Sequence, residues 1–186
     1  MSISDEASVA KLVQAMQQKM LSWLAMREHG DLELAQKFQR SFADKIAQIS
    51  MQGWDFWQKS YPENADAVLS FGDWQDWRSW WQWMLQQAQA QNWQSDERYI
   101  EAYVTQALQK GQGPYKIRHI LQQRSSRSDL IAAYLDLELS DWVTLARQVL
   151  EKKYGQVAIN RNEQAKQMRF LQSRGFTHEQ IWKCFD

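Results

Sequence analysis

The sequence is poor in the residues that break helices, form disulfides or build a membrane span. Its 186 residues contain one cysteine, two prolines and seven glycines. The single Cys184 excludes an internal disulfide and is typical of a reducing compartment. Little proline and glycine favours long helices over a turn-rich sheet. Because no run of about eighteen apolar residues occurs and the N-terminus has no basic-then-apolar signal, we expect a cytoplasmic protein without a membrane span.

Charge is balanced over the chain but unevenly distributed. The sequence holds 22 Lys and Arg and 22 Asp and Glu, of which residues 1–96 hold 8 basic and 12 acidic and residues 97–186 hold 14 basic and 10 acidic. A neutral chain does not wrap nucleic acid by its total charge, since affinity for phosphate comes from clustered cations. The C-terminal half has enough cations for a local basic patch, although solvated helix faces explain most of these charges equally well.

Residues 95–124 carry the clearest helix signals in the sequence and predict two helices joined by a short turn that contains two glycines. Ser95 or Asp96 is a suitable N-cap, because a short oxygen side chain accepts from a free backbone N–H. Gly111 and Gly113 end the first helix, and Pro114 opens the second at a position where its missing N–H costs nothing. The apolar positions at helical spacing are Ile100, Val104, Ala107 and Leu108, then Ile117, Ile120 and Leu121.

The N-terminal half predicts a helix over residues 5–27, a second helix capped by Asp31, and a short third helix over 44–50. A cluster of ten aromatic residues follows between about residues 50 and 83. There we expect a loop near Pro62 and a helix from about Trp74 to Gln91, with aromatic side chains around more than half of its circumference. We interpret the cluster as an additional core, and the alternative is an exposed aromatic surface for a partner.

Three segments share an apolar residue, a glutamine and an arginine within a few positions. They are Phe38-Gln39-Arg40, Leu121-Gln122-Gln123-Arg124 and Leu171-Gln172-Ser173-Arg174. The simplest account is three repeats of three helices, with the pattern on the middle helix of each and an insertion inside the first. We therefore predict a first repeat over 1–94, including an insertion at about 50–82, a second over 95–139 and a third over 140–186.

The segments DERYIEAYV and QKGQGPYKIRHILQQR resemble the central repeat of the RecX family, the regulators of the RecA recombinase. The resemblance covers roughly Met20 to Ala47 and Trp83 to Phe185, and the aromatic insertion departs from it. It implies an all-α, elongated fold of three tandem three-helix repeats. It also implies an inhibitor that binds the groove of the RecA–single-stranded DNA filament and suppresses ATPase, strand exchange and coprotease activity, in recombination, DNA repair and SOS control.

No residue pattern indicates catalysis. His29, His119 and His178 are far apart in sequence, and none has the spacing of a metal-ligand pair. We expect each histidine to be a surface or capping residue and Cys184 to be a small buried residue. The sequence therefore predicts a protein that is not an enzyme and that holds no metal and no cofactor.

Binding remains as the function, and the cations of the second and third repeats are the candidate residues. Tyr115 adds an aromatic ring among them. We expect a monomer that contacts the RecA filament, with weak DNA binding in addition. The alternatives are a helical module acting on DNA without RecA, or a scaffold whose Trp segment recruits another protein. The predicted partner-binding residues are Lys110, Tyr115, Lys116, Arg118, Arg124, Arg127, Lys152, Lys153, Arg169 and Arg174.

Overall fold

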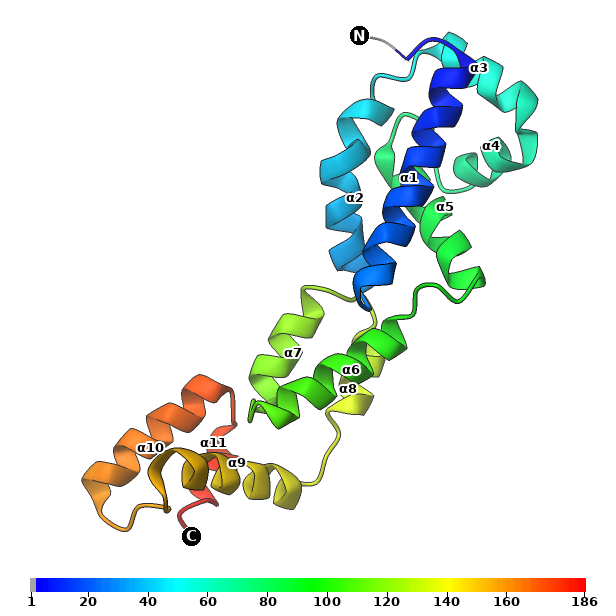
Figure 1. Cartoon of the computed structure of the whole chain (residues 1–186). Helices are drawn as coiled ribbons and strands as arrows, with labels where there is room; N and C mark the ends of the chain where they lie inside the picture. Colours follow the sequence, from blue (N-terminus) through cyan, green and yellow to red (C-terminus); the bar gives the residue numbers. More distant parts are fainter. Residues whose placement is uncertain (1–2) are drawn as a thin grey trace. The chain divides into compact units, whose positions relative to one another are not determined.

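The computed structural model describes residues 3–186, which form eleven α-helices and no strand (Figure 1). Within this range the only extended pairing is an isolated bridge between Ile3 and Ile49, and no helix combines the length and apolarity that a membrane crossing needs. The chain divides into two compact units, one ending at Asp96 and one beginning at Glu97. The prediction of an all-α fold is confirmed.

The N-terminal unit contains five helices, and α1 packs against α2 and α3 while α5 packs against α2 and α4. Their bounds are α1 Glu6–Met26, α2 Asp31–Ile46, α3 Met51–Ser60, α4 Pro62–Leu69 and α5 Trp77–Ala90.

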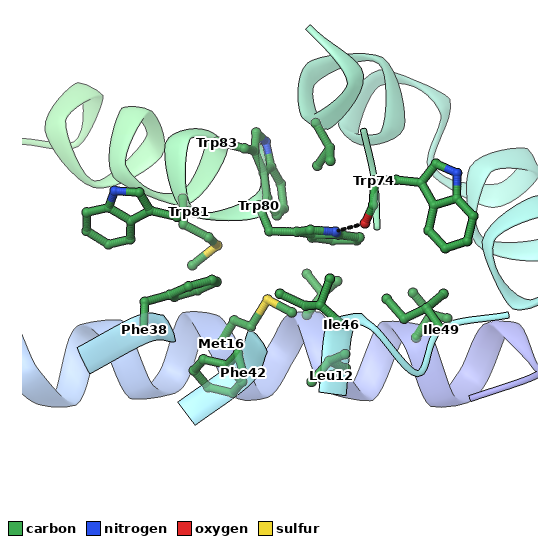
Figure 2. Packing of buried hydrophobic residues seen from close by; sticks show 14 of the residues in the cluster. Leu12, Met16, Phe38, Phe42, Ile46, Ile49, Trp74, Trp80, Trp81 and Trp83 are labelled. Carbon is green, nitrogen blue, oxygen red and sulfur yellow. Dashed lines mark hydrogen bonds between the residues drawn. The ribbon is translucent and has the colours of Figure 1, made fainter. Parts of the chain in front are cut away.

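The aromatic cluster is the centre of the N-terminal core (Figure 2). Trp80 is fully buried, and its indole N–H donates to the carbonyl of Trp74 at 2.7 Å. Its ring lies 5.2 Å from Trp57 and is T-shaped to Trp54, whereas Trp81 packs on Phe38 of α2. The tryptophans on both sides of α5 are covered, so the interpretation as core is confirmed. The core is not an additional one, because these rings belong to the same cluster as the apolar side chains of α1 and α2.

Several predicted boundaries in this unit are wrong. Residues 44–50 form no separate helix, because α2 continues to Ile46 and the chain then turns into the bridge at Ile49. Pro62 begins α4 and lies in no loop, which is consistent with the fixed φ and missing N–H that suit a first helical position. The helix expected from Trp74 begins at Trp77, after a cap by Asp76.

The predicted cap at Asp31 is also wrong, and the reason lies far along the chain. Gly30 is the N-cap of α2 and has no side chain that could accept from the N–H of Asp31; the carboxylate of Asp31 itself accepts from the N–H of Leu32 at 2.8 Å. Instead, the carboxylate of Asp96 accepts from the backbone N–H of Asp31 at 3.0 Å. Gln94 donates to the same carboxylate and to the carbonyl of His29, so residues 94–96, at the end of this unit, hold the turn between α1 and α2.

The C-terminal unit contains six helices around a second core. They are α6 Asp96–Gln109, α7 Pro114–Gln122, α8 Ser128–Tyr134, α9 Leu139–Tyr154, α10 Arg161–Arg174 and α11 His178–Trp182. Fully buried Ile100, Ile117, Leu121, Leu150 and Leu171 belong to this core.

The helix ends of the C-terminal unit agree with the sequence at the glycines and at Thr177. Gly155 and Gly175 are left-handed C-caps, and Thr177 forms a capping box with Gln180. The N-cap of α9 is Glu138, and the N-cap of α10 is Asn160, whose side chain accepts from the backbone N–H of Glu163.

Candidate partner-binding surface

The joint between α6 and α7 lies directly on the C-terminal end of α10. The N–H of Gly113 donates to the carbonyl of Arg174 at 2.8 Å, and the N–H of Tyr115 donates to Gly175 at 3.0 Å. A Cβ on Gly113 would overlap the backbone of Gly175, and a Cβ on Gly175 would overlap Lys116. These glycines therefore permit backbone-to-backbone packing between the second and third predicted repeats, in addition to ending their helices.

A groove of about 670 Å³ lies beside this joint, between the end of α6 and one face each of α9 and α10. Gly111 stands at its edge with φ +66°, and a Cβ there would overlap the side chain of Val149. Four of the ten predicted residues line the groove: Lys110 from the turn after α6, Lys152 and Lys153 from α9, and Arg174 from α10. The fold thus gathers cations that are more than forty positions apart in sequence.

The side chain of Arg174 is fixed in the groove, whereas the lysines stay exposed. Its guanidinium donates to the carbonyl of Lys110 at 2.8 Å and lies 5.1 Å from the ring centre of Phe170. The ammonium of Lys153 lies 3.9 Å from the same ring, a cation–π distance. Across residues 3–186 no carboxylate lies within 4 Å of the charged groups of these four residues, so no ion pair within the described chain neutralises them.

A second group of predicted residues lies on the solvent side of α7. Tyr115 is 64% exposed, and Lys116 and Arg118 are exposed as well. Ile117 between them is fully buried, so the helix presents one apolar face to the core and a basic, aromatic face to solvent.

The remaining three predicted residues belong to neither group. Arg124 is half-buried, with one guanidinium nitrogen 3.5 Å from the hydroxyl of Tyr99. Arg127 makes two hydrogen bonds to Asp129, at 2.7 and 2.9 Å, and these bonds lower the pKa of Asp129 to about 2. Arg169 is exposed on α10 outside the groove lining. The ten residues therefore form two separate groups and three single positions, and their role in binding stays a prediction.

The floor of the groove is apolar and was absent from the residues predicted from the sequence. It comprises Leu108, Leu145, Val149 and Phe170, all partly buried. The sequence contains one local indication of this floor. Phe170 and Arg174 are four residues apart, a spacing that places both side chains on the same face of a helix. The contribution of α6 has no such signal, since it depends on the close packing at Gly111.

Two further expectations concern His29 and Cys184. Cys184 is buried as predicted, and burial raises the pKa of its thiol to about 11. His29 is not a surface residue, because only 1% of it is exposed. Its Nδ1 lies 2.8 Å from the carbonyl of Arg27 and its Nε2 lies 2.7 Å from the ammonium of Lys37. No group of three His, Cys, Asp or Glu side chains in residues 3–186 is arranged to hold a metal ion.

The two helical segments on either side of the groove match known protein domains. Residues 95–135 match the second three-helix domain of RecX, and residues 140–185 match the third. The groove is therefore lined by residues from both matched domains.

Three curated proteins named regulatory protein RecX are similar over this part of the chain. Those of Actinobacillus pleuropneumoniae serotype 5b and Legionella pneumophila strain Corby are each 38% identical over 102 residues. These matches cover 55% and 54% of this chain and 67% and 68% of the relatives. That of Vibrio campbellii is 41% identical over 91 residues, covering 48% of this chain and 59% of the relative. On these similarities, the chain belongs to the RecX family.

Proposed function

We propose that this chain regulates RecA by binding along the groove of the RecA–single-stranded DNA filament and inhibiting it. The inhibited activities are ATP hydrolysis, strand exchange and coprotease activity, which connect the protein to recombination and SOS control. Membership of the RecX family is the observation that carries the proposal.

The distribution of cations supports the same function. The two exposed basic groups lie in the two segments that match RecX domains, one in the groove and one on α7. Small helical repeats suit a helical filament, because successive repeats can contact successive subunits. Neither group is neutralised by an ion pair of its own within the described residues, which leaves both able to attract an acidic surface.

The first experiment titrates the protein into RecA hydrolysing ATP on single-stranded DNA. We expect inhibition at well below one protein per RecA. The variant Lys116→Glu with Arg118→Glu reverses two exposed charges on α7, and we expect it to raise the half-inhibitory concentration at least about tenfold. These residues are better targets than Arg124, because Arg124 is half-buried near Tyr99 and its reversal would also disturb packing.

The matched control reverses two exposed cations of the N-terminal unit, Arg40→Glu with Lys59→Glu. It changes net charge equally but leaves the predicted binding residues intact. If both variants inhibit as strongly as the unchanged protein, the α7 surface is not used. If the unchanged, folded protein has no effect on RecA, the proposed function is wrong.

Direct action on DNA is the second candidate, and the concentration of unneutralised cations in the C-terminal unit is the observation that favours it. It predicts binding to naked duplex or single-stranded DNA without RecA. Because phosphate contacts release counterions, the affinity would fall steeply as salt rises. Measuring binding to a labelled duplex at several salt concentrations separates this candidate from the first.

A further inference from the structure

The groove between α6, α9 and α10 combines two kinds of surface in one hollow. Its rim carries four cations, Lys110, Lys152, Lys153 and Arg174, and its floor is formed by aliphatic side chains and Phe170. No aspartate or glutamate lines it. Elsewhere in the described chain, exposed arginines such as Arg78 and Arg127 have a carboxylate partner at 2.7–3.2 Å. The four groove cations, by contrast, surround one hollow without a carboxylate partner among the described residues.

We infer that this groove is a docking site for an acidic protein segment that carries an apolar anchor residue. The carboxylates of the segment would pair with the rim, and the anchor would cover Leu108, Leu145 and Val149. Charge complementarity argues for an anion, since bringing four like charges to one hollow is unfavourable until an opposite charge neutralises them. The apolar floor argues that the anion is attached to a hydrophobic side chain.

The chemistry of the groove favours a protein segment over a nucleic acid. Proteins that bind single strands combine cations with open aromatic rings on which bases stack. Phe170 is the only aromatic residue of the lining, and its ring is already contacted by Lys153 and Arg174 and by the ring of Tyr154 in a T-shaped pair. The rest of the floor is aliphatic, which suits a leucine, isoleucine or phenylalanine side chain better than a flat base.

The groove is largely formed before any ligand binds. The hydrogen bond from Arg174 to the carbonyl of Lys110 and the close approach of Gly111 to Val149 fix the relative positions of α6, α9 and α10. A preformed site loses less conformational freedom on binding, so a short peptide is long enough to test it.

The test uses the full chain and a fluorescent synthetic peptide of about ten residues, with Leu and Phe at its centre and Asp and Glu on both sides. Fluorescence anisotropy reports binding. We expect saturable binding that weakens at least about tenfold for Lys152→Glu with Lys153→Glu. The matched variant is Arg40→Glu with Lys59→Glu in the N-terminal unit, which changes net charge equally, and we expect it to bind as the unchanged protein does. Both pairs are exposed lysines or arginines, so circular dichroism should report intact helices in each.

A second peptide keeps every charge but replaces Leu and Phe by Ser, and we expect it to bind at least about tenfold more weakly. Equal binding of the two peptides would mean that the groove recognises charge alone, which overturns the inference. The inference also fails if neither peptide binds saturably. It fails again if an oligothymidine of equal charge displaces the peptide and binds more tightly through the same two lysines, because the groove is then a nucleic-acid site.

The inference deepens the proposed function and rests on it for the source of the segment, which we take to be the RecA filament. The peptide assay contains no RecA, so the two can fail separately. Peptide binding without any effect on RecA would contradict the proposed function and leave the groove assignment standing. The groove assignment alone would be contradicted by a different pair of results. The unchanged protein would then bind no peptide, and the variant Lys152→Glu with Lys153→Glu would inhibit RecA as strongly as the unchanged protein.

Discussion

Two glycines of the C-terminal unit differ in how much stability an added Cβ would remove. Gly113 has φ −86°, which any residue adopts, but an added Cβ would overlap the backbone of Gly175 and Phe176. We expect Gly113→Ala to lower the free energy of unfolding of this unit by about 2–4 kcal/mol, because backbone cannot move aside as a flexible side chain can. Urea denaturation followed by circular dichroism measures the loss.

Gly155 provides the matched control for this prediction. It is in the left-handed region at φ +82°, and nothing lies within 4 Å of an added Cβ. Gly155→Ala therefore adds backbone strain without overlap and should cost about 1 kcal/mol. If the two variants lose equal stability, the close packing at Gly113 is not what requires glycine there.

The buried imidazole of His29 makes the N-terminal unit sensitive to pH. Burial lowers the pKa of His29 from its ordinary value of 6.5, and the hydrogen bond to the carbonyl of Arg27 opposes this lowering. The ammonium of Lys37 against Nε2 also disfavours a second positive charge, whereas Glu33, 4.0 Å away, favours it. The folded chain therefore holds the neutral ring to a lower pH than the unfolded chain does.

The sign of the resulting pH dependence follows from linkage. As the pH falls below 6.5, the unfolded chain takes up a proton at His29 before the folded chain does. The free energy of unfolding therefore falls with falling pH, and this loss stops once the folded ring is protonated as well. We expect His29→Gln to flatten the melting temperature between about pH 7 and pH 5, whereas His178→Gln, at an exposed site, keeps the slope of the unchanged protein. Parallel slopes in all three proteins would contradict this assignment.

At the scale of elements, the sequence predicted helices well where their ends have a local cause. Pro114, Gly155, Gly175 and the Thr177 capping box are recognisable from a few neighbouring residues. The start of α2 was not predictable in this way, because its first N–H is satisfied by Asp96, which is 65 positions away.

The candidate site was predictable only in part for the same reason. Its cations could be chosen from the sequence because they cluster around two middle helices. The grouping of Lys110 with Lys152, Lys153 and Arg174 depends on the glycine contacts that bring α6 against α9 and α10. A distant contact of this kind leaves no periodicity to detect. The ion pair between Arg127 and Asp129 is local in sequence, but only the structure revealed it.

The burial of the tryptophans limits how the role of the Trp-rich segment can be tested. Trp54, Trp57, Trp80 and Trp81 are buried in the N-terminal core, so deleting the segment would remove that core. Phe56 and Phe71 are 42% and 41% exposed and can be replaced with less damage. We expect Phe56→Ser with Phe71→Ser to leave inhibition of the RecA ATPase within about twofold, because the predicted binding residues all lie in the C-terminal unit. A large loss of inhibition would instead assign these rings to a partner surface.

At the scale of the whole molecule, each unit has a hydrophobic core made only of its own residues. The core around Trp80 draws its buried members from the N-terminal unit, and the core around Leu121 draws its members from the C-terminal unit. Because burial of apolar surface supplies most of the stability of a fold, two separate cores predict two units that can lose structure separately.

This independence can be measured by native-state hydrogen exchange on the full chain. Trp80→Ala removes a fully buried ring and its hydrogen bond to Trp74, and we expect it to destabilise the N-terminal unit by about 3–5 kcal/mol. Amide protection should then fall in α1–α5 and stay unchanged in α7–α11, while Gly113→Ala should do the reverse. If either variant lowers protection equally throughout the chain, the two cores unfold as one cooperative unit. With separate unfolding, Trp80→Ala should still bind the acidic peptide, because the groove depends only on the C-terminal core.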